Sequence, residues 1–152
     1  RVPLAGARYP GCDARGPFEH VLQGKMSIQF NVAATLVSGT AGEHNFALLD
    51  DAAVRGLIAR TTLTVDDALT AAYPGAQGAE VALTLHAGHV LRRRLDDVRF
   101  ASADEVRARF RAALTAAFDA EHAGAVDAAI ESLDSLADAG ALPRLLRRAR
   151  RA

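Results

Sequence analysis

The segment AEVALTLHAGHVLRRRL, residues 79–95, constrains the fold of this 152-residue chain more strongly than any other segment. Apolar side chains alternate with small or polar ones over residues 81–85, which is the two-residue period of a β-strand. Ala87 and Gly88 supply a two-residue turn, and a return strand begins at Val90. We therefore expect an antiparallel β-hairpin here.

Helical patterns stand on both sides of this hairpin. Ser27 is predicted to cap a helix whose apolar residues recur every four positions and which ends at Gly39. Asp50 is predicted to cap a second helix over residues 51–60, and the branched residues of 61–65 predict a strand. After the hairpin, Ser102 and Glu105 form an S-x-x-E capping box that predicts the start of a further helix. A last full helix is expected to end at Gly140.

Strands grouped between helical runs are typical of the α+β class, so we expect a small mixed or antiparallel sheet packed by helices. Residues 1–26 contain many prolines and glycines and are predicted to be a loop or arm, with a short strand at its start. Residues 27–100 are expected to form the α+β domain, and residues 101–152 the C-terminal helices. The chain begins RVPLAGARYPGC, without an initiator methionine, and is therefore expected to be part of a longer protein.

The composition argues against several classes of protein. Eighteen basic residues balance eighteen acidic ones, whereas nucleic-acid and membrane-surface proteins carry a basic excess. The basic tail 144–151 contains no aromatic residue for stacking on bases. Cys12, the single cysteine, favours a reducing compartment, so we expect a cytoplasmic protein. No apolar run reaches the roughly 18–20 residues that span a bilayer.

The one lysine of the chain, Lys25, stands two residues before the predicted helix cap Ser27. Together with the unpaired N–H groups of the first helical turn, these two side chains predict a corner that binds a carboxylate. The alternative is a surface lysine that lies over the arm. His20 is a further candidate contact, and its alternative is a packed or surface histidine.

Metal and nucleotide sites find no support in the sequence. His86 and His89 flank the hairpin turn, but no further ligand stands at a helpful spacing, so solvated turn histidines are expected. There is no phosphate loop, dinucleotide fingerprint or G-x-S-x-G motif. Arg92, Arg93 and Arg94 lie on the return strand, where alternation sends the middle one to the opposite face.

Several segments, in this order, resemble the C-terminal part of the MmgE/PrpD family: YPGC…GPFEHVLQGKMSIQFNVAATLVSG, DDAAVRGLIARTTLTVDD, AEVALTLHAGHVLRRRL and SADEVRARFRAAL. The family includes 2-methylcitrate dehydratase, cis-aconitate decarboxylase and iminodisuccinate epimerase. Its serine-led helix pattern is matched by Ser27, Ile28, Gln29, Phe30, Ala33, Leu36 and Gly39. The similarity runs through nearly the whole chain.

The resemblance implies a fold and a chemistry. Members have a large all-helical domain and a smaller α+β lid, with the active site between them. Residues 27–100 would be the lid, and residues 101–152 would pack on a helical domain outside this chain. The implied chemistry is proton abstraction beside a carboxylate of a di- or tricarboxylate, without metal or organic cofactor. Loss of water, loss of carbon dioxide or epimerisation follows, and a homodimer is implied.

The resemblance implies candidate substrate contacts but identifies no catalytic residue in this chain. These candidates are Lys25, Ser27, Gln29 and His20, with Lys25 expected to hold a carboxylate rather than to act as a base. Phe30 stands where many members carry a tyrosine, and it cannot donate a hydrogen bond, so the sequence does not indicate which of the three reactions applies. The chain alone is expected to be inactive. The alternatives are a non-catalytic ligand-binding or dimerisation module and a small binding protein with a basic tail.

Overall fold

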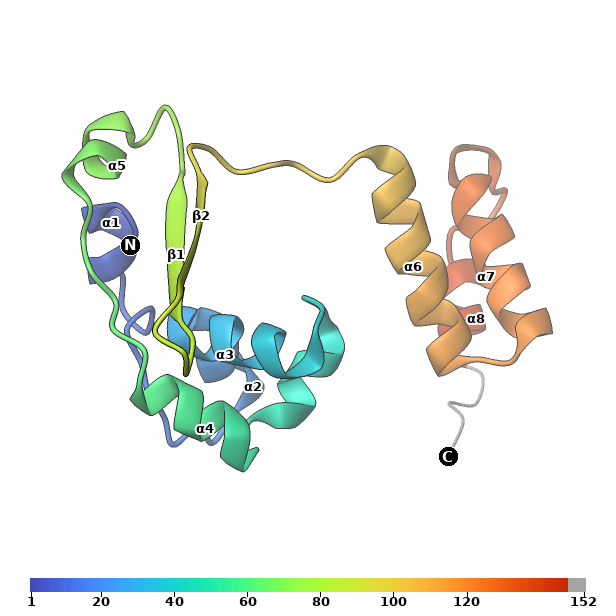
Figure 1. The fold of residues 1–152 in the computed structure, drawn as a ribbon. Helices are drawn as coiled ribbons and strands as arrows, with labels where there is room; N and C mark the ends of the chain where they lie inside the picture. Colours follow the sequence, from blue (N-terminus) through green and yellow to red (C-terminus); the bar gives the residue numbers. More distant parts are fainter. Residues whose placement is uncertain (148–152) are drawn as a thin grey trace. The chain divides into compact units, whose positions relative to one another are not determined.

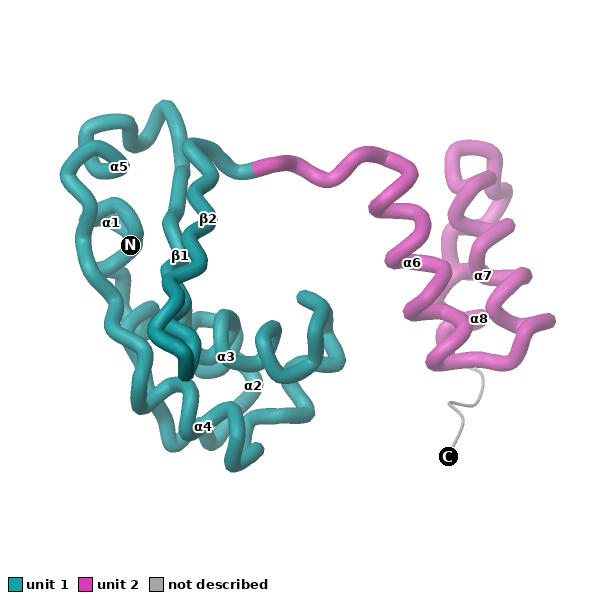
Figure 2. Tube along the Cα trace, viewed as in Figure 1, with its two compact units in different colours: residues 1–98 teal, residues 99–152 magenta. Residues whose placement is uncertain are grey.

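The computed structural model describes residues 1–147. The chain divides into two compact units at Val98 and Arg99, unit 1 before this point and unit 2 after it (Figures 1 and 2). Helices predominate, and the sheet is a two-stranded antiparallel hairpin, so the expected α+β class is confirmed. Unit 1 contains α1 (Leu4–Arg8), α2 (Val21–Met26), α3 (Ile28–Ser38), the 3₁₀-helix η1 (Glu43–Leu48), α4 (Ala52–Ala59), α5 (Asp67–Ala72), β1 (Ala79–Thr84) and β2 (Val90–Leu95).

The predicted boundaries of α3 are confirmed. The Ser27 hydroxyl accepts a hydrogen bond from Phe30 N at 3.0 Å, which satisfies one of the N–H groups left unpaired in a first helical turn. Gly39 ends the helix with φ +79°, and its N–H donates to Thr35 O. This left-handed conformation favours glycine over residues with a side chain.

The core of unit 1 lies where α3 meets α4. Its buried residues are Phe18, Phe30, Ala33, Ala34, Val54 and Ile58. Two consecutive alanines on α3 leave room for α4 to approach closely. The cap of α4 differs from expectation, because Asp51 rather than Asp50 accepts from the N–H groups of Ala53 and Val54. Asp50 instead pairs with Arg55 at 3.5 Å.

The hairpin is confirmed, but its turn is longer than expected. Leu85 N donates to His89 O at 2.8 Å, which leaves the three residues 86–88 in the loop. Gly88 has φ +81°, as expected for the left-handed third position of a three-residue hairpin loop. The predicted two-residue turn is therefore wrong, and Gly88 explains why the longer loop is stable.

An extended segment at Arg1–Val2 lies beside β1. Arg1 and Glu80 exchange two backbone hydrogen bonds of 2.7 and 2.9 Å. On its other side, Val2 pairs with residues 64–66 through two bonds of 3.0 Å. The predicted strand over 61–65 is thus reduced to a single bridge between Val2 and Val65.

Two further segments contain helices, and one of them is the arm that was predicted as a loop. The arm 1–26 holds α1 and α2, and the segment after Val65 holds α5, which Asp66 caps by accepting from Leu69 N at 3.0 Å. Gly24 suits α2 because a Cβ there would lie 2.6 Å from Leu49 Cδ2. Close packing, rather than flexibility, therefore explains this glycine.

Unit 2 consists of α6 (Ala103–Ala117), α7 (Ala120–Glu131), the 3₁₀-helix η2 (Leu133–Ser135) and α8 (Ala141–Leu146). The capping box of Ser102 and Glu105 is confirmed, whereas the helix expected to reach Gly140 ends at Glu131. The buried cluster is Leu114, Phe118, Ala123 and Val126, with Leu142 and Leu145 packed against it. Arg148, Arg150 and Arg151 of the basic tail lie outside the described residues. Within residues 1–147, no helix has the length and hydrophobicity needed to cross a membrane.

Candidate functional site

Lys25 lies in the last turn of α2 rather than ahead of an isolated helix start. A cation is favourable there, because the helix dipole is negative at its C-terminus. Lys25 Nζ lies 3.3 Å from Glu43 Oε1 and 5.0 Å from the centroid of the Phe46 ring. The lysine side chain is 43% exposed and the glutamate side chain 83%, so this ion pair faces solvent.

Ser27 and the start of α3 are covered by the arm. The Ser27 hydroxyl is fully buried and donates to Ala14 O at 2.5 Å. Ile28 N donates to Cys12 O at 2.9 Å and Phe30 N to the Ser27 hydroxyl at 3.0 Å, so the chain itself occupies two of the first-turn N–H groups. The structure consequently does not bring the Lys25 ammonium and the Ser27 hydroxyl together at one open corner.

The other two candidate contacts, Gln29 and His20, differ in exposure. Gln29 is fully buried; its Nε2 donates to Asp13, while its Oε1 has no hydrogen-bond partner within residues 1–147. His20 is exposed at the start of α2, where Gln23 Oε1 accepts from the backbone N–H groups of Glu19 and His20.

Phe30, at the position of the family tyrosine, belongs to the core. Its ring has no exposure and lies 5.4 Å from the ring of Phe18 and 6.0 Å from that of Phe46, centroid to centroid. An aromatic side chain at this point therefore holds the core together and does not face an open cavity.

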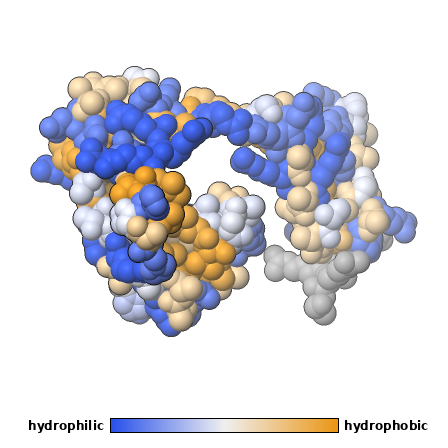
Figure 3. Space-filling view, viewed as in Figure 1, coloured by the Kyte–Doolittle hydropathy of each residue, from blue (hydrophilic) through white to orange (hydrophobic). Residues whose placement is uncertain are grey.

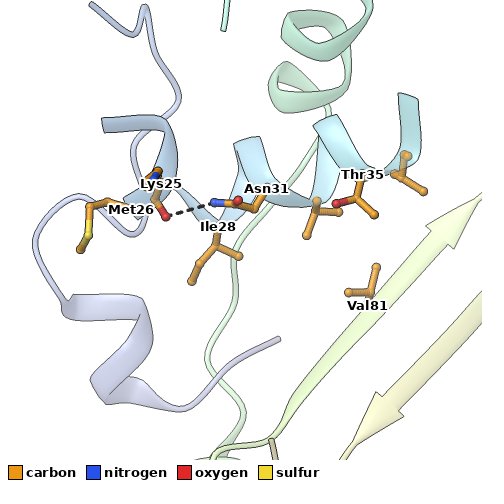
Figure 4. Close-up of a pocket in the computed structure, with 8 residues that line it drawn as sticks. Lys25, Met26, Ile28, Asn31, Thr35 and Val81 are labelled. Atoms are coloured by element: carbon orange, nitrogen blue, oxygen red, sulfur yellow. Dashed lines mark hydrogen bonds between the residues drawn. The ribbon is translucent and has the colours of Figure 1, made fainter. Parts of the chain in front are cut away.

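Asn31 connects α2 to α3, and sequence reasoning missed it. Its Nδ2 donates to the carbonyl oxygens of Gly24, Lys25 and Ser27 at 3.0, 3.2 and 2.7 Å. Figure 4 shows the bond to Lys25. Gly24 and Lys25 lie in the last turn of α2, where a helix leaves carbonyl oxygens without helical partners, whereas Ser27 O also accepts from Asn31 N. Asn31 thus fixes the backbone that carries Lys25, and only its place one turn after the cap could have indicated this role.

A hollow lies between α3 and the hairpin of unit 1. One cavity of about 430 Å³ is lined by Lys25, Met26, Ile28, Asn31, Val32, Thr35, Leu36 and Val81. A second cavity of about 1020 Å³ shares Ile28, Val32, Leu36 and Val81 with the first. Figure 4 shows Val81 projecting from β1 toward α3, and Figure 3 shows hydrophobic residues gathered beside the hairpin. We name this space, defined by those four shared residues, the α3–hairpin hollow.

The opposite face of the hairpin carries a network of ion pairs. Glu80 lies 2.9 Å from Arg92, and Arg94 lies 3.4 Å from Asp66 and 2.8 Å from Asp96. The backbone N–H of Leu69 lowers the pKa of the Asp66 carboxyl, and the Arg94 guanidinium adds to this effect. The lowered pKa favours the ionised form of Asp66, which through Arg94 holds β2 against the segment that precedes α5.

Within the described part of the chain, histidine, cysteine, aspartate and glutamate side chains form no group of three that could hold a metal ion. The chemical features of unit 1 are thus an apolar hollow, one lysine at its rim and arginines on the hairpin.

A comparison with protein families adds a direct finding. The family model described as the MmgE/PrpD C-terminal domain matches residues 1–135. This range includes the α3–hairpin hollow and most of unit 2. A search of curated proteins yields no match.

Proposed function

This chain belongs to the MmgE/PrpD family, and from that membership we propose that it is the C-terminal part of a cofactor-independent lyase or isomerase. The reaction would begin with proton abstraction beside a carboxylate of a di- or tricarboxylate. Loss of water, loss of carbon dioxide or epimerisation would follow. The observation that carries this proposal is the family match over residues 1–135. The bases that take the proton would come from the helical remainder of the enzyme.

Lys25 is proposed to hold one substrate carboxylate. Its present partner Glu43 is a highly exposed side chain, and such surface pairs contribute only about 0–1 kcal/mol. A substrate carboxylate can therefore take the place of Glu43 at little cost. Phe46 and Asn31 would keep the lysine in position, one through its ring and the other through the backbone.

Mutation of Lys25 in the complete protein tests this role. A charge-assisted hydrogen bond contributes about 1.5–3 kcal/mol, so Lys25→Ala should lower kcat/KM for the carboxylate substrate by about tenfold or more. Lys25→Arg should retain part of the activity, since it keeps a cation. Arg55→Ala is the matched control, because Arg55 is an exposed, ion-paired residue of α4 that lines neither cavity. Unchanged kinetics in Lys25→Ala would contradict the role.

The partners and location that accompany this function are also proposals. The protein would work as a homodimer in the cytoplasm, with the helical domain of the same protein packed on unit 2. A non-catalytic module for ligand binding or dimerisation is the second candidate, favoured by the exposure of large apolar residues on the hairpin, among them Leu85, Leu91 and Leu95. Turnover of a panel of di- and tricarboxylates by the complete protein distinguishes the two candidates.

A further inference from the structure

Helix α3 has two apolar faces, and only one of them is buried in the core of unit 1. Phe30 and Ala33 have no exposure and belong to the buried cluster that α3 forms with α4. Ile28, Val32 and Leu36 recur every four residues and line both cavities of the α3–hairpin hollow. Residues at this spacing form a single stripe along a helix. The fold therefore leaves a second apolar stripe of α3 open to the hollow.

The hairpin supplies the facing wall of the hollow. Val81 of β1 lines both cavities, and Leu83, two residues further along the strand, lines the larger one. Figure 4 shows Ile28 of α3 and Val81 of β1 projecting into the space between the two elements. Val81 and Leu36 remain 37% and 45% exposed. At these residues the two apolar walls therefore do not pack on each other.

The charged group of the smaller cavity lies at one end of the α3 stripe. Lys25 lines this cavity and stands three residues before Ile28. The other polar lining residues, Asn31 and Thr35, carry no charge. From Ile28 to Leu36 the stripe extends for about 12 Å along the helix axis, at about 1.5 Å per residue. A few polar groups beside a mostly apolar wall are the usual composition of a site for a small molecule.

The larger cavity has charged residues of its own, and they already have partners in the chain. Arg1 Nε lies 3.8 Å from Glu80 Oε1, and Arg60 Nε donates to Gly56 O at 3.2 Å. None of these residues lines the smaller cavity. Among residues 1–147, Lys25 is therefore the one charged residue that a ligand of the smaller cavity meets.

We propose that the substrate carries a hydrocarbon branch of several carbons, which lies in the α3–hairpin hollow while Lys25 holds one carboxylate. The hollow then selects alkyl-substituted acids over the unsubstituted acid, because moving each methylene from water to an apolar surface is favourable. An acid without the branch leaves the apolar walls of α3 and β1 in contact with water. This inference rests on the proposed function, because it takes the carboxylate at Lys25 as the anchor.

The test is the dependence of affinity on the length of the branch, measured with the complete protein. Titration calorimetry gives the Kd of succinate and of 2-alkylsuccinates with branches of one, three and five carbons. In the wild type the Kd should fall about two- to fourfold with each added methylene. Lys25→Ala should weaken all four acids by about tenfold or more and keep the dependence on length, since it removes the anchor and not the apolar wall.

Two valine substitutions on α3 locate the branch. Val32→Phe places a ring in the hollow, so the Kd of the five-carbon acid should rise about tenfold or more while that of succinate stays within about twofold. Val37→Phe is the matched control, because Val37 is an exposed residue of the same helix that lines neither cavity. It should leave the Kd of every acid within about twofold. Circular dichroism of each variant checks that the fold is retained.

Each other outcome is decisive. A Kd that depends on Lys25 but not on branch length would overturn this inference and leave the proposed function intact. A dependence on length that Val32→Phe leaves unchanged, or that Val37→Phe removes equally, would place the branch outside the hollow and overturn the inference. Unchanged binding of all four acids in Lys25→Ala would overturn both the role of Lys25 and the inference that rests on it. A wild-type protein that binds none of the acids would do the same.

Discussion

The ammonium group of Lys25 lies 3.3 Å from a carboxylate oxygen of Glu43, at the point where α2 ends and η1 begins. Ser27 serves both helices here, because it is the residue after α2 and the cap of α3. The lysine therefore stabilises the end of one helix while it stands near the start of the next. Because α3 begins directly after α2 ends, a cation that suits the C-terminus of α2 also precedes the cap of α3 in the sequence.

Removal of the Glu43 charge should strengthen carboxylate binding at Lys25. In Glu43→Gln the ammonium loses an ion pair with a competing carboxylate that contributes about 0.2–1 kcal/mol, so the Kd of a carboxylate substrate should fall by a factor of about 1.4 to 5. Calorimetry at low ionic strength measures this change, which should shrink in 1 M salt because the Debye length is then about 3 Å. Asp50→Gln, which breaks an exposed pair on another element, is the control. An unchanged Kd at low salt would show that Glu43 does not compete.

Gly78 permits the close approach that begins the hairpin. A Cβ at this position would lie 2.6 Å from the carbonyl oxygens of Leu95 and Asp96, both of which are backbone atoms. Because overpacking of this kind costs about 1–3 kcal/mol, Gly78→Ala should lower the free energy of unfolding of unit 1 by that amount. Denaturant unfolding followed by circular dichroism measures the loss.

Gly56→Ala is the matched control for that substitution. Gly56 lies inside α4, it is exposed, and a Cβ there meets no atom within 4 Å. Alanine in an open helix interior is more stable than glycine by about 0.5–1 kcal/mol, so this variant should gain stability. A loss of stability in both variants would show that steric contact at Gly78 is not the cause.

Acid should weaken the start of α6 through Glu105. Its pKa is lowered from 4.5 to about 2, chiefly by the hydrogen bond from Ser102 N and further by the Arg99 guanidinium. A lowered pKa means that the folded state favours the ionised carboxylate, so the contribution is complete above about pH 4.5 and is lost as the pH falls toward 2. The protection factors of the α6 amides, which correct for the intrinsic pH dependence of exchange, should therefore fall as the pH is lowered over this range.

The control for Glu105 removes its titration. Glu105→Gln keeps an acceptor for Ser102 N but carries no charge at any pH. The variant should show a smaller pH dependence of exchange than the wild type between about pH 4.5 and 2. If both proteins respond alike, other acids of unit 2, such as Asp138 with its lowered pKa, account for the acid sensitivity.

Local signals in the sequence predicted local structure well. The caps Ser27 and Ser102, the stop at Gly39 and the strand β1 were each predicted from residues within a few positions, and all are confirmed. The segment 61–65 failed as a strand, because its partner Val2 lies about sixty positions earlier and offers only one bridge. Pairing between such distant segments produces no periodic pattern in the sequence.

The candidate site was harder to predict than the fold for a similar reason. A helix pattern shows that Ser27 caps α3. It does not show that Cys12 O already accepts from Ile28 N, or that Ala14 O already accepts from the Ser27 hydroxyl. Strand alternation separated Arg93 from its neighbours, yet only the register shows that its cross-strand partner is Val81, a residue that lines the hollow. Contacts between segments, rather than residue types, therefore decided which polar groups remain available to a ligand.

The position of Phe30 provides a test of whether an aromatic hydroxyl fits this core. Phe30 has no exposure and lies between Phe18 and Phe46, so a tyrosine hydroxyl would be buried among apolar rings. An unpaired buried hydroxyl costs about 1–3 kcal/mol, and Phe30→Tyr should lower the free energy of unfolding by that amount. Phe100→Tyr, at a residue that is 82% exposed, should change stability by less than about 0.5 kcal/mol. Equal stability of Phe30→Tyr and wild type in thermal unfolding would show that the hydroxyl finds a hydrogen-bond partner, and with it a polar opening beside the start of α3.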